Sequence, residues 1–487
     1  MNYKIQVLLS AILLMFTGFN SKANNVRINN VNLVNDSTIN FSISWDNSWK
    51  SQYAPANNDA VWIFIKKRDC ASLQWSHVDL SKNVAEHSAG EPLTIAYDNK
   101  DVTTNAKGIY VQRANVGAGN INEVSVTLRM KGAVSGEFDF KIFGIEMVYA
   151  PEGSFFLGDG SSTDYGFGTY VSNGVFNPFK VTSEAALVTA TSSTSTYYNR
   201  LFAGGYNVNN NSIPLAYPKG FKAFYAMKYE LTQGQYVDFL NCLQSDQAAL
   251  RYRPNTDDYG INYAGEWPEI STKFPYRAAG FLSWQDLLAY LDWACLRPMT
   301  EFEYEKLSRG PLEPVTNEFA WGSTSITAVV YPPVNVGMAN ESASNTASSA
   351  GGLANCQGTI AAPLRSGFAA KPGTTRYSSG AGYYGAMELT GNVHEYVVGI
   401  QADGRTYSGN VGDGEITGAT AAASGLANVT GWPSSTSCKM VRGGSFSDGS
   451  LTNNLKLRVA CRNPAASGYV TSDPSTRYNV VGGRGVR

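Results

Sequence analysis

Few residues of this chain could hold a transition metal or act as a general base. Its 487 residues include only three histidines. Of these, His77 and His87 lie in the first part of the chain and His394 lies alone much further along. No two are spaced as a His-x-x-x-His pair, and nothing near His394 resembles a nucleophile elbow. The sequence therefore speaks against a histidine–carboxylate iron site and against a Ser-His-Asp triad.

The six cysteines are the other candidates for chemistry. No two are spaced as Cys-x-x-Cys, so neither a zinc ribbon nor a thioredoxin-like site is predicted. Export would permit disulfides, but the spacing identifies no pairs, and burial as small apolar side chains is an equally good interpretation. The cysteines are Cys70, Cys242, Cys295, Cys356, Cys438 and Cys461.

Arginines are concentrated in the last part of the chain. An anion-binding patch is one interpretation of them. We favour a structural role, because the planar guanidinium group makes bidentate contacts with carboxylates and fixes loops through backbone carbonyls. These residues are Arg442, Arg458, Arg462, Arg477, Arg484 and Arg487.

The elements that must position these residues fall into two regions. Residues 24–145 read as short strands: residues 39–45 alternate apolar and polar, and residues 61–65 form a continuous apolar run. Such patterns at this spacing predict an antiparallel β-sandwich of the immunoglobulin or fibronectin kind.

Residues 146–487 have few helical patterns and many loops. Helices are predicted to begin after Thr232, Ser283 and Thr300, because each precedes apolar residues at helical spacing. Glu303, three residues after Thr300, completes a capping box. Long stretches rich in Gly, Ser, Thr, Ala and Asn separate the helices. The chain as a whole is therefore predicted to belong to the α+β class, with an irregular, loop-rich second domain.

The first residues and the charge restrict where the protein acts. A basic residue, an apolar run and small residues before a cleavage point predict a secretory signal peptide over residues 1–23. No later run approaches the roughly 18 apolar residues of a membrane span, so the mature protein should lack one. The formal net charge of −1 speaks against nucleic acid as a partner. We therefore expect a periplasmic, cell-surface or extracellular location.

Six phrases, in order, resemble the formylglycine-generating enzyme family, also called sulfatase-modifying factors. The resemblance covers residues 145–487 and implies an irregular fold similar to a C-type lectin, and the preceding sandwich lies outside it. The phrases occupy residues 147–155, 224–232, 293–304, 319–322, 391–396 and 442–445.

The resemblance also shows where this chain departs from the family. The catalytic members carry a cysteine three residues after the serine of Arg-Gly-Gly-Ser and a second cysteine five residues later. Here these places hold Asp448 and Asn453, and the nearby thiol of Cys461 is at neither. Cu(I) prefers thiolates, for which a carboxylate and an amide are poor substitutes. The sequence therefore speaks against copper and against the family's oxidation.

A structural calcium ion is predicted, by resemblance, in the segment 388–395. There Glu388 and Glu395 would supply carboxylates, and Gly391 and Val393 backbone carbonyls. Calcium prefers several oxygen ligands, which a tight loop can direct inward. The alternative is a glycine turn with two solvated carboxylates.

These observations favour an exported, non-catalytic binding or structural protein of the cell envelope or surface. Its expected partners are protein or carbohydrate, with self-assembly as a further interpretation. One alternative is a formylglycine-generating oxidoreductase with a rearranged site. Another is a ligand-binding protein with diversified C-terminal lectin-like loops.

Overall fold

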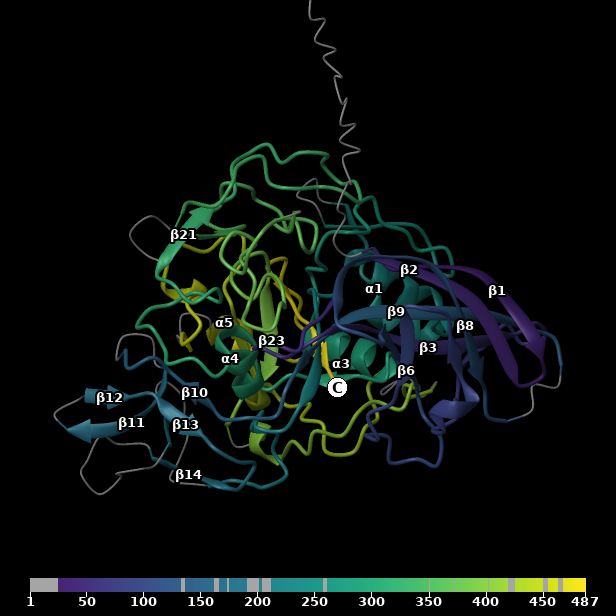
Figure 1. Ribbon diagram of the computed structural model, residues 1–487, viewed down its shortest axis with the longest axis horizontal. Helices are drawn as coiled ribbons and strands as arrows, with labels where there is room; N and C mark the ends of the chain where they lie inside the picture. Colours follow the sequence, from purple (N-terminus) through teal and green to yellow (C-terminus); the bar gives the residue numbers. More distant parts are fainter. Residues whose placement is uncertain are drawn as a thin grey trace, which may run out of the picture.

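The chain folds mainly into short strands and loops, with few helices (Figure 1). This mixture agrees with the predicted α+β class. The predicted signal peptide, residues 1–23, lies outside the described residues, as does Asn453. The computed structural model describes residues 25–132, 136–161, 166–172, 175–190, 201–203, 212–256, 261–349, 351–371, 373–401, 403–418, 425–449, 454–462 and 467–487.

The first part of the chain forms two sheets from antiparallel strand pairs. One has the strand order β1-β2-β8-β5, and β3, β4, β6, β7 and β9 belong to the other. The strands are β1 (Arg27–Asn35), β2 (Thr38–Lys50), β3 (Asp59–Asp69), β4 (Trp75–Val78), β5 (Ser88–Ala89), β6 (Leu93–Ala96), β7 (Ile109–Arg113), β8 (Gly117–Arg129) and β9 (Phe138–Ala150).

The patterns of β2 and β3 explain how the two sheets pack. Ile39, Phe41 and Ile43 of β2 alternate with polar residues, and they join a buried cluster with Val61 and Ile63 of β3. Successive side chains of a strand point to opposite faces, so only one face of β2 needs to be apolar. The continuous apolar run in β3 has a different cause, since both faces of that strand are buried.

The second face of β3 packs against the later part of the chain. The Phe64 and Trp293 rings meet edge to face with their centroids 5.1 Å apart. The Trp62 indole Nε1 donates to the Ala294 carbonyl over 2.9 Å. Trp62 and Phe64 belong to the same hydrophobic cluster as the helices of the second part. The two parts therefore share a core.

The two parts of the chain also share a β-sheet. β9 pairs with β3 along one edge and with β17 (Phe224–Met227) along the other. The sheet continues through β26 (Gly485–Val486) to β20 (Arg297–Pro298), with the order β20-β26-β17-β9-β3-β7-β6. The boundary predicted between residues 145 and 146 falls inside β9, so the backbone hydrogen bonds of one strand serve both parts.

The three predicted helices are confirmed, and each begins at its expected cap. Thr232, Ser283 and Thr300 all accept a hydrogen bond from the third residue of the helix, which bonds back to the cap. The prediction recognised this reciprocal box only at Thr300, and it did not include α2 or α5. The helices are α1 (Gln233–Asn241), α2 (Ser245–Arg251), α3 (Trp284–Trp293), α4 (Glu301–Arg309) and α5 (Ser467–Thr471).

The remaining strands are short, and long irregular segments connect them (Figure 1). Three of them form one sheet, which carries residues of the site described below: β23 (His394–Val398), β24 (Lys439–Arg442) and β25 (Val481–Gly482). The others are β10 (Phe155–Leu157), β11 (Phe167–Ser172), β12 (Val175–Asn177), β13 (Phe179–Val181), β14 (Leu187–Ala190), β15 (Leu201–Ala203), β16 (Ser212–Ile213), β18 (Asn255–Thr256), β19 (Asn262–Tyr263), β20 (Arg297–Pro298), β21 (Ser325–Ala328), β22 (Gly351–Ala354) and β26 (Gly485–Val486).

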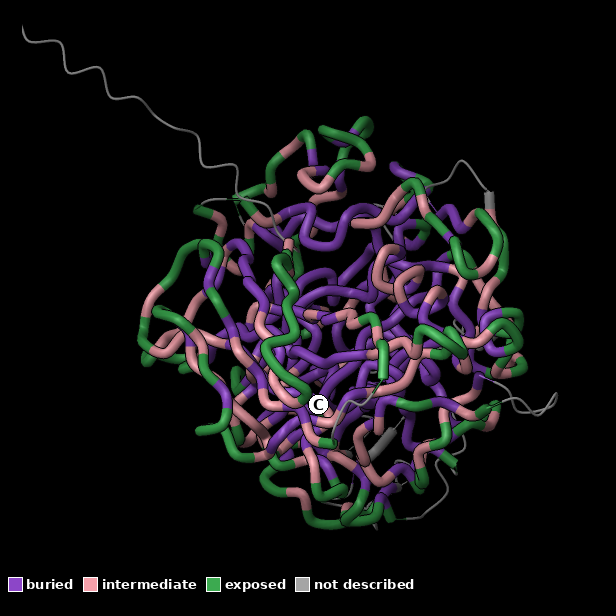
Figure 2. Tube along the Cα trace, turned by 90° about the vertical axis from the view of Figure 1, so that its right-hand side faces the viewer, coloured by how far each residue is buried: buried purple, intermediate pink, exposed green. Residues whose placement is uncertain are grey.

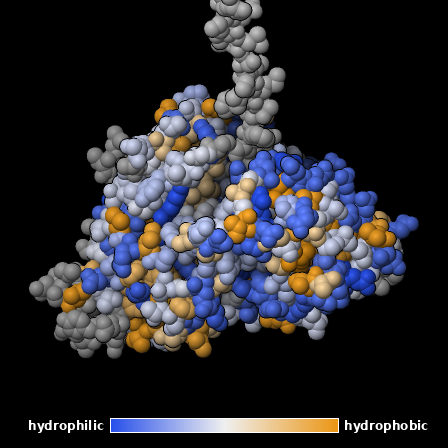
Figure 3. All heavy atoms as spheres, viewed as in Figure 1, coloured by the Kyte–Doolittle hydropathy of each residue, from blue (hydrophilic) through white to orange (hydrophobic). Residues whose placement is uncertain are grey.

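Buried residues fill the centre of the molecule and exposed residues lie on the outer loops (Figure 2). On the face shown in Figure 3, apolar residues are scattered among hydrophilic ones. Among the helices of the described ranges, none has the length and apolar character needed to cross a membrane.

Candidate functional site

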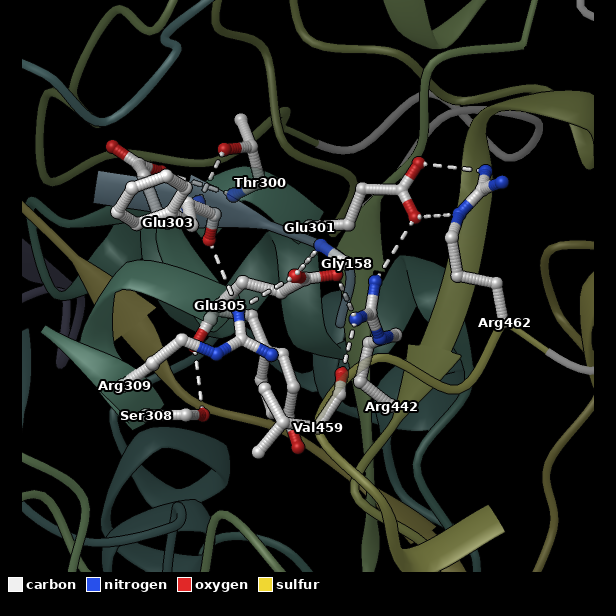
Figure 4. Close-up of polar contacts among 12 residues, drawn as sticks. Gly158, Thr300, Glu301, Glu303, Glu305, Ser308, Arg309, Arg442, Val459 and Arg462 are labelled. Atoms are coloured by element: carbon white, nitrogen blue, oxygen red, sulfur yellow. Dashed lines mark hydrogen bonds and ion pairs between the residues drawn. The ribbon is translucent and has the colours of Figure 1, made fainter. Parts of the chain in front are cut away.

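The Arg-Gly-Gly-Ser segment begins with an arginine that is completely buried. Arg442 ends β24, and its guanidinium group contacts two glutamates of α4 (Figure 4). Nη1 lies 3.2 Å from Glu301 Oε2 and Nη2 lies 2.6 Å from Glu305 Oε1. Nη2 also donates to the Val459 carbonyl over 2.5 Å. These contacts fix β24 and the following tail to α4.

Two more arginines extend this contact into a chain of alternating charges. Arg462 donates to both oxygens of Glu301, over 2.7 and 3.0 Å. Beyond Glu305, Arg309 Nη1 lies 3.1 Å from Glu305 Oε2 and its Nε donates to Glu318. We call these six residues the arginine–glutamate chain: Arg462, Glu301, Arg442, Glu305, Arg309 and Glu318.

The arginine–glutamate chain neutralises itself, with three cations and three carboxylates buried among apolar side chains. Taking charges out of water costs several kcal/mol per ion, and mutual attraction offsets this cost only while every partner is present. The arginine that opens the motif is therefore explained by structure, as the sequence analysis favoured.

The two glycines of the motif turn the chain from this network towards Ser445. Gly443 and Gly444 have φ values of 87° and 70°, in the left-handed region that favours glycine. A Cβ atom on Gly444 would lie 2.6 Å from a methyl group of Leu457, and one on Gly443 would lie 2.9 Å from the Leu389 carbonyl oxygen. Only glycine fits both positions.

Beyond the turn, Asp448 accepts contacts from three side chains. Ser445 Oγ donates to Oδ2 over 2.7 Å, and His394 Nε2 lies 2.7 Å from the same oxygen. Lys456 Nζ lies 2.8 Å from Oδ1. Burial raises the pKa of this carboxyl, but the contacts with His394 and the other two partners outweigh it, so the pKa of Asp448 is lowered. Asp448 is therefore a charge-compensated carboxylate.

Ser445, His394 and Asp448 do not form a nucleophilic triad. In such a triad the histidine lies between the serine and the acid and takes the proton of the serine. Here the serine hydroxyl donates directly to Asp448, at the oxygen that the histidine also approaches. The acceptor of the serine proton is therefore a weakly basic carboxylate and not the imidazole.

The predicted calcium segment is organised around an arginine. Arg484 donates to both oxygens of Glu395, over 2.6 and 2.7 Å, and both side chains are completely buried. Its remaining N–H groups donate to backbone carbonyls, including that of Met387 over 2.6 Å. A guanidinium group therefore supplies the positive charge beside Glu395.

Glu388 and a third carboxylate complete this buried group. Glu388 Oε1 accepts from the Gly367 amide over 2.9 Å, while Oε2 has no hydrogen-bond partner in the described structure. Glu230 accepts from the Asn392 side chain over 2.5 Å and from the Val393 amide over 3.1 Å. Burial raises the pKa of Glu388 to about 7, and burial together with Glu388 and Glu395 raises that of Glu230.

Comparison with protein-family models gives one match, which covers most of the second part of the chain. The model of the sulfatase-modifying factor enzyme 1-like domain matches residues 187–486. The chain belongs to the sulfatase-modifying factor family. A search of the curated proteins finds no match for it.

For this sulfatase-modifying factor protein, the residues at the family's copper site do not fit copper. Asp448 stands where the first cysteine is expected, and its two oxygens are already held by cationic and hydroxyl donors. Cys356, next to the Gln357 amide that donates to the Asp448 carbonyl, has its pKa raised to about 12 by burial and by Asp448. In the metal-free protein this thiol stays protonated at neutral pH, and Cys356 stands at neither of the family's two cysteine positions. Cys461 is also buried.

At the calcium ligands predicted from the sulfatase-modifying factor resemblance, Arg484 donates to both oxygens of Glu395. Gly391 and Val393 lie in the tight loop as expected, with Gly391 at φ 86°. Within the described ranges, no three His, Cys, Asp or Glu side chains are grouped so that they could hold a metal ion. Calcium binding therefore stays a prediction, and the observed contacts favour the guanidinium group as the cation.

Three residues of the clusters around Asp448 and Glu395 were not predicted from the sequence. Glu230 joins Glu388 and Glu395 from a position more than 150 residues earlier, and Lys456 and Ser445 join Asp448. Glu230 lies in residues 224–232, which had been recognised only as a family phrase. No local pattern indicates its contacts, because its partners Asn392 and Val393 lie more than 150 residues later.

The raised pKa of Glu388 predicts that stability falls as the pH rises. The folded state keeps this proton to about pH 7, whereas the carboxyl has an ordinary value of 4.5 when exposed. The stabilising contribution is thus complete at low pH and is lost as the pH rises through about 7. We expect the free energy of unfolding to fall between about pH 4.5 and pH 7 and to level off above, with a slope of up to about 1.4 kcal/mol per pH unit for one proton.

Glu388→Gln should flatten this fall, because the amide cannot ionise, and chemical denaturation at several pH values measures it. Glu266→Gln, at an exposed glutamate, is the matched control and should leave the slope unchanged. An equal slope in Glu388→Gln and the unmodified protein would contradict the assignment.

The contacts of Arg484 predict that calcium leaves the melting temperature unchanged. The protein is compared by differential scanning calorimetry in excess calcium and in excess chelator. A higher melting temperature in calcium, absent in Glu395→Gln, would instead establish the calcium site of the resemblance.

Proposed function

We propose that this protein is an exported, non-catalytic binding or structural protein of the cell envelope or surface. Asp448 carries this proposal. It occupies the place of the family's first cysteine, it is ion-paired with Lys456, and its Oδ2 lies 2.7 Å from His394 Nε2. A carboxylate in that setting has neither the softness nor the nucleophilicity of a thiolate.

The retained framework supports a scaffold role. The arginine–glutamate chain and the two-glycine turn hold the tail in place although no thiol follows the turn at the expected position. Long loops that connect short strands provide variable surface on a rigid core, which is the usual arrangement of binding proteins. The expected partners remain protein or carbohydrate, with self-assembly as a further proposal.

The first part of the chain would serve attachment or assembly in this proposal. We interpret its two sheets and the cluster between them as the predicted β-sandwich. Its shared sheet and shared core with the later part would transmit a fixed orientation to whatever it binds. Export itself rests on the predicted signal peptide.

The proposal predicts that the copper-loaded protein will not oxidise a cysteine-containing sulfatase peptide. Mass spectrometry of the peptide after incubation should show no formylglycine. A family member that carries both cysteines, assayed in parallel with the same peptide, is the positive control.

Formation of the aldehyde by this protein, and its loss in Cys461→Ser, would contradict the proposal and establish the alternative, an oxidoreductase with a rearranged site. Cys242→Ser, at a buried thiol far from Asp448 in the sequence, is the matched control for that substitution.

A further inference from the structure

A cavity of about 380 Å³ lies between the two parts of the chain. Asn47 and Trp49 of β2 and Asn57 of the loop between β2 and β3 line one side. The opposite side is lined by residues between 370 and 387 and by Lys228 and Tyr229. The Asn57 side chain donates to the Tyr384 carbonyl over 2.8 Å, so the two sides are joined at this rim. The volume is in the range of pockets that hold small ligands.

Aromatic side chains dominate the apolar lining of this cavity. Trp49 is only partly buried, and its position is fixed from two directions. Its indole Nε1 donates to Asn57 Oδ1 over 3.3 Å, and Lys228 Nζ lies 4.9 Å from a ring centroid of Trp49. Tyr383 and Tyr384 lie edge to face, with ring centroids 5.0 Å apart. A fixed aromatic face beside hydrogen-bonding groups suits ligands that have both an apolar face and polar edges.

The charged lining is entirely positive. Three cations line the cavity and no carboxylate does. Lys228 is neutralised by Glu146 at 3.0 Å and by Asp59 at 3.7 Å. The other two cations have no ion-pair partner in the described part of the chain, so the cavity carries a net positive charge.

Those two cations, Lys371 and Arg376, donate hydrogen bonds to backbone carbonyls, and the guanidinium group of Arg376 also lies 5.4 Å from the ring centroid of Tyr383. Lys371 Nζ donates to the Ala343 carbonyl over 3.0 Å. Arg376 Nη2 donates to the carbonyls of Ser308 and Ala320 over 2.9 and 2.8 Å. The buried Nε of Arg376 has no hydrogen-bond partner among the described residues. Both side chains therefore keep their full charge and have N–H groups to offer an anion.

Hydroxyl and amide groups complete the lining, from Asn47, Thr374, Thr375 and Ser379. They are neutral donors and acceptors of the kind that hydroxyl-rich ligands need. Aromatic faces, neutral polar groups and two uncompensated cations together describe the recognition of a sugar that carries a negative charge.

We propose that this cavity binds an acidic saccharide. The sugar ring packs on Trp49, and its carboxylate or sulfate group lies beside Lys371 and Arg376. This inference rests on the proposed binding role and specifies its ligand class and its site. An acidic peptide would form ion pairs with the two cations, but it would leave the rigid aromatic face and the hydroxyl groups beside it without contacts.

Isothermal titration calorimetry of the full chain tests the proposal with four probes: tri-galacturonate, a sulfated chondroitin disaccharide, neutral maltotriose and tri-glutamate. We expect binding of at least one acidic saccharide, with maltotriose and tri-glutamate weaker by roughly tenfold or more. The chondroitin disaccharide carries a carboxylate and a sulfate, whereas tri-galacturonate carries carboxylates only. Binding of the chondroitin disaccharide without binding of tri-galacturonate would therefore indicate that the sulfate is required.

Two variants and two matched controls locate the site. Trp49→Ala and Lys371→Glu should each weaken binding of the acidic saccharide roughly tenfold or more. Trp75→Ala removes another partly buried tryptophan that lies outside this cavity, and Lys180→Glu reverses an exposed lysine elsewhere, so both should bind normally. Lys371 is exposed, so its substitution tests the charge without disturbing the fold.

The proposal is overturned if neither acidic saccharide binds, if maltotriose or tri-glutamate binds as tightly, or if Lys371→Glu binds like the unmodified protein. Failure here is distinct from failure of the proposed function. Failure of the proposed function would be seen as formylglycine in the sulfatase peptide, and that assay does not depend on saccharide binding.

Discussion

The arginine–glutamate chain is the interaction on which the second part of this structure depends. It joins α4, the end of β24 and the tail beyond Leu457 through charges that have no access to water. Because the charge of each buried ion is compensated by its neighbours in the chain, the network requires all its members at once. This requirement accounts for an Arg-Gly-Gly-Ser motif in a chain without the thiol that follows it in the enzymes. The arginine and the glycines build the turn, whatever residue comes after it.

Other arginines of the C-terminal part also form ion pairs with carboxylates. Arg484, between β25 and β26, pairs with Glu395 of β23, and Arg477 pairs with Asp286 at the start of α3. Arg487 reaches Asp98 and Asp101 in the first part of the chain, and its guanidinium group lies 4.1 Å from a ring centroid of Trp62. In each case an arginine of the tail is anchored to an acidic residue distant in the sequence. The last part of the chain thus unites elements that the loops leave far apart.

Features that depend on neighbouring residues could be predicted from the sequence, whereas contacts between residues far apart in the chain could not. The caps at Thr232, Ser283 and Thr300 use neighbouring residues only, so their helices could be predicted. The replacement of a cysteine by Asp448 was equally visible, because motif spacing is local. By contrast, neither the meeting of Glu230 with Glu395 nor a cavity shared by Trp49 and Tyr383 has any local pattern. The boundary near residue 145 followed the start of the family resemblance, whereas the strand Phe138–Ala150 continues across it.

The free energy of unfolding of Arg442→Met tests the central claim, that the motif arginine is a structural ion, most directly. Removing one member of a buried ion network should cost about 3–5 kcal/mol, measured by chemical denaturation. Combining it with Glu305→Met should cost clearly less than the sum of the two single losses, because each single change already leaves the other's charge without its partner. An Arg442→Met protein within about 0.5 kcal/mol of the unmodified stability would contradict the account, since only surface substitutions are typically so mild.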